Sequence, residues 1–229
     1  SLSNNRRYHV YQNEFRRVAD VNWNESDPER ASWSRERCIE LRRQLLLAQV
    51  GTDQQMNLAA GLVALGEDVD SELLQAIEKL LLASRTEQLP VMSGIFRRLS
   101  QQLRSSLLGV LASGTEEPLR RLNAACLIST WFLSAGDVEC EAALAASAEF
   151  LAVELVKQRP VDVPVLQELL RPAFPQLIPV LTQVYSGKAT GPLQRAVALG
   201  VLAEAVRDDS AALVELVMQS GEDSMGVLL

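Results

Sequence analysis

The chain has 229 residues, a net charge of −7 at pH 7, 48% apolar residues and only 5% aromatic residues. The apolar fraction is large enough for a core and excludes a disordered chain, while abundant Leu and Ala favour helix. The acidic balance disfavours nonspecific binding to nucleic acid. No apolar run approaches the length of about eighteen residues that suggests a membrane span, and no signal-peptide pattern is present. We therefore expect a cytoplasmic protein without a membrane segment.

Three cysteines, Cys38, Cys126 and Cys140, show no C-x-x-C spacing and are odd in number. This usage is typical of buried thiols in a reducing compartment rather than of a disulfide framework. The chain does not begin with Met and ends in the apolar run Val227–Leu229. We therefore expect a segment of a larger protein, with a partly ordered N-terminal extension over residues 1–30. Residues 31–229 are expected to form a single HEAT-like helical repeat domain that is truncated at its C-terminus.

The first part of this domain predicts three helices in chain order. The first begins between residues 26 and 34 and ends near Gln49, with Ile39 and Leu45 in its buried stripe. The second covers residues 54–65 and is rich in small residues. The third runs to about Ser84, with Asp70-Ser71 at its start, because Asp and Ser favour the N-cap position.

The rest of the chain predicts helices that proline and glycine delimit, since proline fits the first turn of a helix and glycine ends one. In chain order we expect a helix from Pro90, a bend, a partner helix through Leu111, a helix from Pro118 to about Ser134, an Ala-rich helix from Glu141 to Gln158, a helix from Val163 to about Leu170, a break at Pro172 and Pro175, a helix from about Gln176 to Tyr185, a helix from Pro192 through Val206, and a last helix from Ala211 to about Gln219.

An internal repeat organises these helices. Pro90-Val91 recurs as Pro164-Val165 (164 − 90 = 74), and the same offset of 74 residues relates many further positions. The matching pairs include Arg85/Arg159, Arg97/Arg171, Gln102/Gln176, Leu103/Leu177, Leu107/Leu181, Pro118/Pro192, Arg121/Arg195 and Ala124/Ala198. A period of this size is about twice that of a HEAT or armadillo unit. We therefore predict an all-α, HEAT/armadillo-like α-solenoid of about 10–12 helices, with two helical hairpins in each repeat.

Several segments of this pattern resemble the HEAT-like helical segment of large bacterial serine/threonine protein kinases that carry a C-terminal domain similar to formylglycine-generating (sulfatase-modifying) enzymes. The resemblance lies in Leu81-Leu82-Ala83, Leu89-Pro90-Val91-Met92, Arg121-Leu122-Asn123-Ala124-Ala125, Leu169-Leu170-Arg171-Pro172 and the stretch from Arg195 to Met218. It covers roughly Cys38 to Leu229. It departs at Trp131–Asp137, where the family tends to have a Tyr-Asp-Pro turn and a Trp. The resemblance implies a linker or scaffold within a kinase-type signalling protein, without kinase chemistry in this segment.

No catalytic, cofactor-binding or metal-binding residues are predicted. His9 is the only histidine, so a Ser-His-Asp triad or a His-based metal site would depend on one residue near the start of the chain. The acidic cluster Glu67-Asp68-Asp70 lacks the spacing of a calcium loop, and capping of a helix explains it better. The glycines form no phosphate-binding loop, and the kinase motifs H-R-D and D-F-G are absent from the sequence.

Arginines are the candidate contact residues. We single out Arg97, Arg98, Arg121, Arg171 and Arg195, because two of them recur at the same places in the second copy. Arginines on stacked helices can bind acidic or phosphorylated segments of a partner. The alternative is that each arginine pairs with a helix end or a Glu and holds the repeats together.

These observations predict a non-catalytic interaction or scaffold module that binds protein partners or neighbouring domains. A rigid spacer between catalytic domains is the second interpretation. An enzymatic or small-ligand-binding domain is the third, and it is disfavoured because solenoids leave few convergent polar groups.

Overall fold

The structure is a computed structural model that describes residues 39–40, 42–45, 47, 58–62, 69–186, 191–205 and 207. Of these residues 85% are helical and none lies in a strand, which confirms the all-α class. The chain divides into two compact units, residues 1–83 and residues 84–229, and each is described by itself. The expected extension over residues 1–30 and the expected last helix from Ala211 lie outside the described residues.

In the first unit, α4 (Ser71–Ala83) begins where the capping pattern predicts, and its buried side includes Leu73, Ile77 and Leu81. The described part of the first expected helix buries Leu45, as expected, but Ile39 is 68% exposed, so its assignment to the same buried stripe was wrong. The reason is geometric. Six residues separate these two positions, which places their side chains about 120° apart around a helix.

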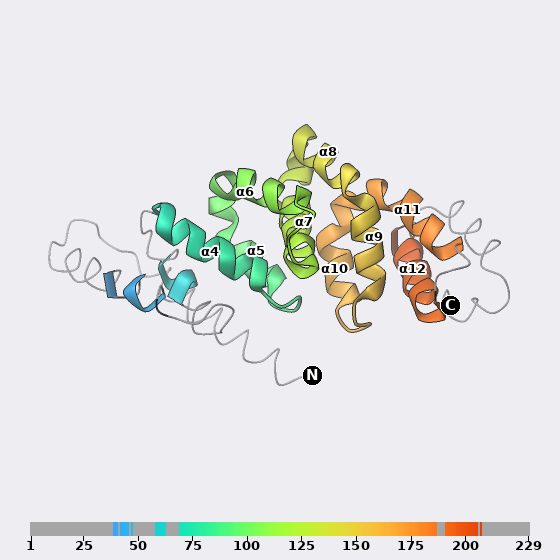
Figure 1. The fold of residues 1–229 in the computed structure, drawn as a ribbon, viewed down its shortest axis with the longest axis horizontal. Coiled ribbons are helices and arrows are strands. Elements are labelled where there is room, and N and C mark those ends of the chain that lie inside the picture. The colour runs from blue at the N-terminus through green and yellow to red at the C-terminus, as the bar shows by residue number, and fades with distance from the viewer. Residues whose placement is uncertain are drawn as a thin grey trace. The chain divides into compact units, whose positions relative to one another are not determined.

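The second unit contains, in chain order, α5 (Leu89–Phe96), the 3-10 helix η1 (Arg97–Leu99), α6 (Ser100–Ala112), α7 (Pro118–Phe132), η2 (Leu133–Ala135), α8 (Val138–Ala146), α9 (Ala148–Lys157), α10 (Val163–Leu170), η3 (Arg171–Ala173), α11 (Phe174–Ser186) and α12 (Pro192–Ala205) (Figure 1). The helices α7 and α12 each begin at a proline, and α5 and α10 each have a proline as their second residue. These are the positions where a missing N–H costs nothing.

The two sequence copies have the same secondary structure in the same register. The elements α10, η3, α11 and α12 each begin 74 residues after α5, η1, α6 and α7 (163 − 89 = 74), and the first three also end at that offset. Equivalent apolar positions are buried in both copies, among them Leu103/Leu177, Leu107/Leu181, Ala124/Ala198 and Ile128/Leu202. The sequence repeat is therefore a structural repeat at the level of these elements.

Helix α7 is the core of the second unit. It contacts α5, α6, α8, α9 and α10, and every residue from Leu122 to Ser129 is buried. Its small residues Ala124, Ala125 and Cys126 leave room for these neighbours. Two polar side chains inside this core are hydrogen-bonded: Asn123 donates to the Ser84 carbonyl at 2.8 Å, and the Trp131 indole N–H donates to the Ser93 carbonyl at 3.0 Å. Such bonds offset the cost of burying polar groups.

The single helix expected from Glu141 to Gln158 is two helices in the structure. The Ala-rich stretch forms α8 and α9, which are separated at Ser147, and α8 begins before Glu141 because Asp137 caps it through the Cys140 N–H. Both halves contact α7 and α11, while α8 also packs on α6 and α9 also packs on α12. Helix α11 begins two residues before the expected Gln176, since Pro175 fits its first turn.

Candidate functional site

Arg97 and Arg171 occupy the same place in the two copies, at the first residue of η1 and of η3. Both are exposed. The Arg171 guanidinium is paired: its Nη2 lies 2.8 Å from the Glu168 Oε2 in α10 and 3.3 Å from the Glu204 Oε1 in α12. This pairing links η3 to α12 at the surface.

Arg97 and Arg98 differ from Arg171. Both are exposed, and neither makes an ion pair with another residue in the described part of the chain. Arg98 has no arginine counterpart, since Pro172 occupies its place in the second copy. Two consecutive exposed arginines therefore lie on the 3-10 turn between α5 and α6.

Arg121 and Arg195 are equivalent in sequence but have different surroundings. The Arg121 Nε donates to the Leu111 carbonyl at the end of α6 at 3.1 Å, and its guanidinium carbon lies 3.7 Å from the centre of the Phe150 ring in α9. A cation over an aromatic face is a favourable contact. Arg121 thus joins α6, α7 and α9, whereas Arg195 is exposed on α12.

Arg104 makes the most extensive ionic contact of the second unit. Its guanidinium donates to both carboxylate oxygens of Asp137 at 2.9 and 2.8 Å, and Nη2 lies 2.7 Å from Glu139. These bonds raise the pKa of Arg104 above its ordinary value. The same guanidinium, together with the Cys140 N–H, holds the pKa of Asp137 well below its usual range. The contact fixes the start of α8 against α6.

The sequence did not point to this contact, because 33 residues separate Arg104 and Asp137 and no local spacing relates them. The sequence indicated only one half of this contact, the role of Asp137 at the start of a helix. Asp137 follows Gly136 and precedes a helix, which is the pattern of an N-cap residue. Its arginine partner comes from another helix and depends on tertiary packing.

The two cysteines of the described part are free and buried, as expected. Burial raises the pKa of the Cys140 thiol to about 11, and complete burial raises the pKa of the Cys126 thiol still further. Both thiols are therefore neutral at physiological pH. Since the thiolate is the nucleophile, this environment is typical of structural cysteines.

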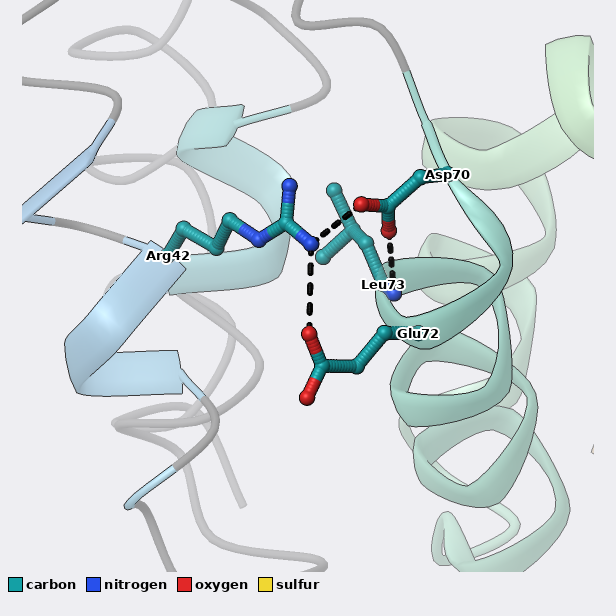
Figure 2. Close-up of polar contacts among 4 residues, drawn as sticks. All are labelled: Arg42, Asp70, Glu72 and Leu73. Carbon is teal, nitrogen blue, oxygen red and sulfur yellow. Dashed lines mark hydrogen bonds and ion pairs between the residues drawn. The ribbon is translucent and has the colours of Figure 1, made fainter.

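In the described part of the first unit, a polar cluster lies at the start of α4 (Figure 2). Asp70 accepts the Leu73 N–H of α4 at 3.0 Å, and Arg42 bonds both Asp70 and Glu72, the latter at 3.3 Å. The Leu73 N–H and the Arg42 guanidinium together lower the pKa of Asp70, while the Asp70 carboxylate raises the pKa of Arg42. This is a capped helix start with a counter-charge from an earlier helix, in keeping with the capping interpretation of the acidic cluster.

Among the described residues, no three metal-ligating side chains gather at one place. None of the helices in that part of the chain combines the length and the apolar character that a membrane crossing needs. Comparisons with protein-family models, with curated proteins and with solved structures found no match to this chain. The assignment of function therefore depends on the chain's own sequence and geometry.

Proposed function

We propose that this chain is a non-catalytic helical-repeat module that binds protein partners or neighbouring domains. The observation that carries the proposal is the structural duplication, in which α10, η3, α11 and α12 each begin 74 residues after α5, η1, α6 and α7. A helical unit that buries its apolar face on its neighbours leaves a long, variable outer surface, and proteins of this kind use that surface for binding.

The proposal includes a HEAT/armadillo-like α-solenoid arrangement with two helical hairpins per 74-residue repeat. Its support is the size of the period and the burial of equivalent apolar positions in both copies. The proposal also includes a place within a larger bacterial kinase-type signalling protein. That part depends on the resemblance described above, through segments such as Leu89-Pro90-Val91-Met92 and Leu169-Leu170-Arg171-Pro172.

The polar contacts of the second unit support a scaffold rather than an active site. Arg104, Arg121 and Arg171 each join side chains or carbonyls of different helices, so these charges serve the packing of the repeat. A catalytic site would need ionisable groups that converge on a space for substrate. The chemistry that the described charges support is recognition at the surface.

The same contacts favour a second candidate function, a rigid spacer between catalytic domains. The Arg104–Asp137 contact and the stacking of Arg121 on Phe150 tie neighbouring helices together. Such ties limit bending, which is the property a spacer requires. The two candidates differ in whether the outer surface contacts anything.

Site-specific photocrosslinking in the intact parent protein, in its own cells, separates the two candidates. A photoreactive residue is introduced at exposed Arg98 or at Leu193, which is 66% exposed on α12. The same residue at Lys79 in the first unit, also exposed, serves as a reference. A reproducible crosslink from the second unit to one protein or neighbouring domain supports the interaction module. Absence of crosslinks, combined with full activity after replacement by an unrelated helical spacer of equal length, contradicts it and favours the spacer.

Sequencing the gene on both sides of this segment tests whether the parent is a kinase-type signalling protein. Kinase motifs upstream and a domain similar to formylglycine-generating enzymes downstream would support the signalling context. Other neighbours would remove that context and leave the repeat module as a separate proposal.

A further inference from the structure

The two copies place an arginine at one position but surround it with different charges. In the second copy Arg171 is neutralised by Glu168, three residues before it, and by Glu204 of α12. In the first copy the residues equivalent to these two carboxylates are Gly94 and Thr130. The guanidinium is therefore retained in the first copy, while both of its internal partners are absent.

The neighbouring position increases this difference. The first copy has a second exposed arginine, Arg98, where the second copy has Pro172. The corner between α5 and α6 in the first copy thus has two positive charges and no carboxylate at the equivalent places. The corresponding corner between α10 and α11 in the second copy has one positive charge and two carboxylates. Thr130 adds no charge, and its hydroxyl donates to the carbonyls of Cys126 and Leu169.

The corner is also open. Gly94 is exposed, and a Cβ atom added to it would meet no atom within 4 Å. The Cβ position that begins the Glu168 side chain in the second copy is therefore open at Gly94 in the first copy. The second copy shows that a carboxylate in this place reaches the guanidinium, at 2.8 Å.

We propose that the corner formed by Gly94, Arg97 and Arg98 binds a carboxylate-bearing, acidic segment of a protein partner, which supplies in trans the charges that Glu168 and Glu204 supply within the second copy. The inference depends on the proposed interaction function and names the chemistry of one of its contacts. Arginine suits such a ligand, since its guanidinium bonds a carboxylate with two parallel hydrogen bonds, and Arg98 supplies a second positive charge at the next residue.

The net charge of −7 does not oppose this assignment at close range. At physiological salt, charges act over about 8 Å, so a local pair of arginines determines the field at the corner. The net negative charge of the whole chain instead repels acidic chains in general, which disfavours nonspecific binding of such chains. We expect the corner to select a segment that also fits the surrounding surface.

The test follows the side-chain Nε–H signals of the arginines by NMR in the full chain, during titration with a glutamate peptide of about ten residues. A glutamine peptide of equal length is the uncharged control, and a phosphoserine peptide tests the other source of negative charge. We expect the signals of Arg97 and Arg98 to shift with the glutamate peptide, and those of Arg171 and Arg121 to stay unchanged.

Two variants exchange the properties of the copies. Gly94→Glu installs the carboxylate of the second copy at the same helical spacing, and it should weaken binding of the glutamate peptide at least about tenfold, the effect of losing about one charge-assisted contact. The double change Glu168→Gln and Glu204→Gln should make Arg171 respond to the peptide. Gly94→Gln fills the same space without the charge, so it is the matched control for Gly94→Glu and should weaken binding clearly less than Gly94→Glu does.

Three results would overturn the inference: no shift of Arg97 and Arg98, an equal response of Arg171 in the unmodified chain, or unchanged affinity in Gly94→Glu. A response to the phosphoserine peptide alone would overturn the assignment to carboxylates. The crosslinking experiment with the photoreactive residue at Leu193, outside the corner, is independent of these results. A partner that crosslinks equally to the Gly94→Glu variant would leave the interaction function intact and remove only this corner from it.

Discussion

Pro179 offers the sharpest test of the duplicated architecture, because its equivalent in α6 is Ser105. Pro179 is the sixth residue of α11, past the first turn, so its ring displaces the hydrogen bond that the Pro175 carbonyl would otherwise accept. Both Pro179 and Ser105 are exposed, so exchanging them changes little apolar burial. The change Pro179→Ser should therefore stabilise the second unit, and Ser105→Pro should destabilise it.

The magnitude follows from the helix positions. An interior proline costs about 3 kcal/mol relative to alanine, and serine itself costs about 0.5 kcal/mol. Two effects reduce the gain from Pro179→Ser: Pro175, whose carbonyl lacks this hydrogen bond, is an exposed residue, and the loss of a proline increases the entropy of the unfolded chain, which costs about 0.4–1 kcal/mol of stability. We expect a gain of about 1–2 kcal/mol. In Ser105→Pro the loss should be about 3 kcal/mol, since α6 is adapted to serine there.

Urea and thermal unfolding, followed by circular dichroism at the helical band, measure both changes. For a chain of this size about 1 kcal/mol corresponds to a melting shift of roughly 2–4 °C. Since α11 belongs to the second unit, a separate transition of the first unit should not move. An unchanged or lower melting temperature for Pro179→Ser would refute the reasoning. It would mean that the proline produces a bend which the packing of α11 on α12 and α9 requires.

Three further substitutions test single contacts. Asn123→Ala removes a buried hydrogen bond and should cost about 1–2 kcal/mol of unfolding free energy in urea titrations; no loss would show that the bond is energetically neutral. Arg121→Ala should cost about 1–3 kcal/mol, while exposed Arg195→Ala should stay within about 0.5 kcal/mol, and equal effects would contradict the packing role of Arg121. The pKa of Asp137 is lowered on folding, so its contribution is fully present above about pH 4 and is lost as the pH falls further. The unfolding free energies of the unmodified chain and of Asp137→Asn should therefore converge below that pH, and a constant difference in acid would contradict the assignment.

Much of the helical pattern was predictable because its signals are local. Pro118, Pro192 and Asp70 mark helix starts through backbone geometry and N–H groups that depend only on neighbouring residues. The division of the Ala-rich stretch at Ser147 was not predictable, since both halves are good helix formers. The bend accompanies tertiary contacts that differ in part between the halves, with α6 beside α8 and α12 beside α9.

The sequence by itself determined that the described residues are helical and that two copies share one register of 74 residues, because apolar spacing and proline act within a few residues of the chain. Only the tertiary structure decided what each arginine does. Arg104 and Arg121 are used in packing, Arg171 is neutralised across two helices, and Arg97 is exposed. These differences depend on partners more than 30 residues away or on neighbouring helices, and a charge in the sequence carries no information about which distant group will meet it.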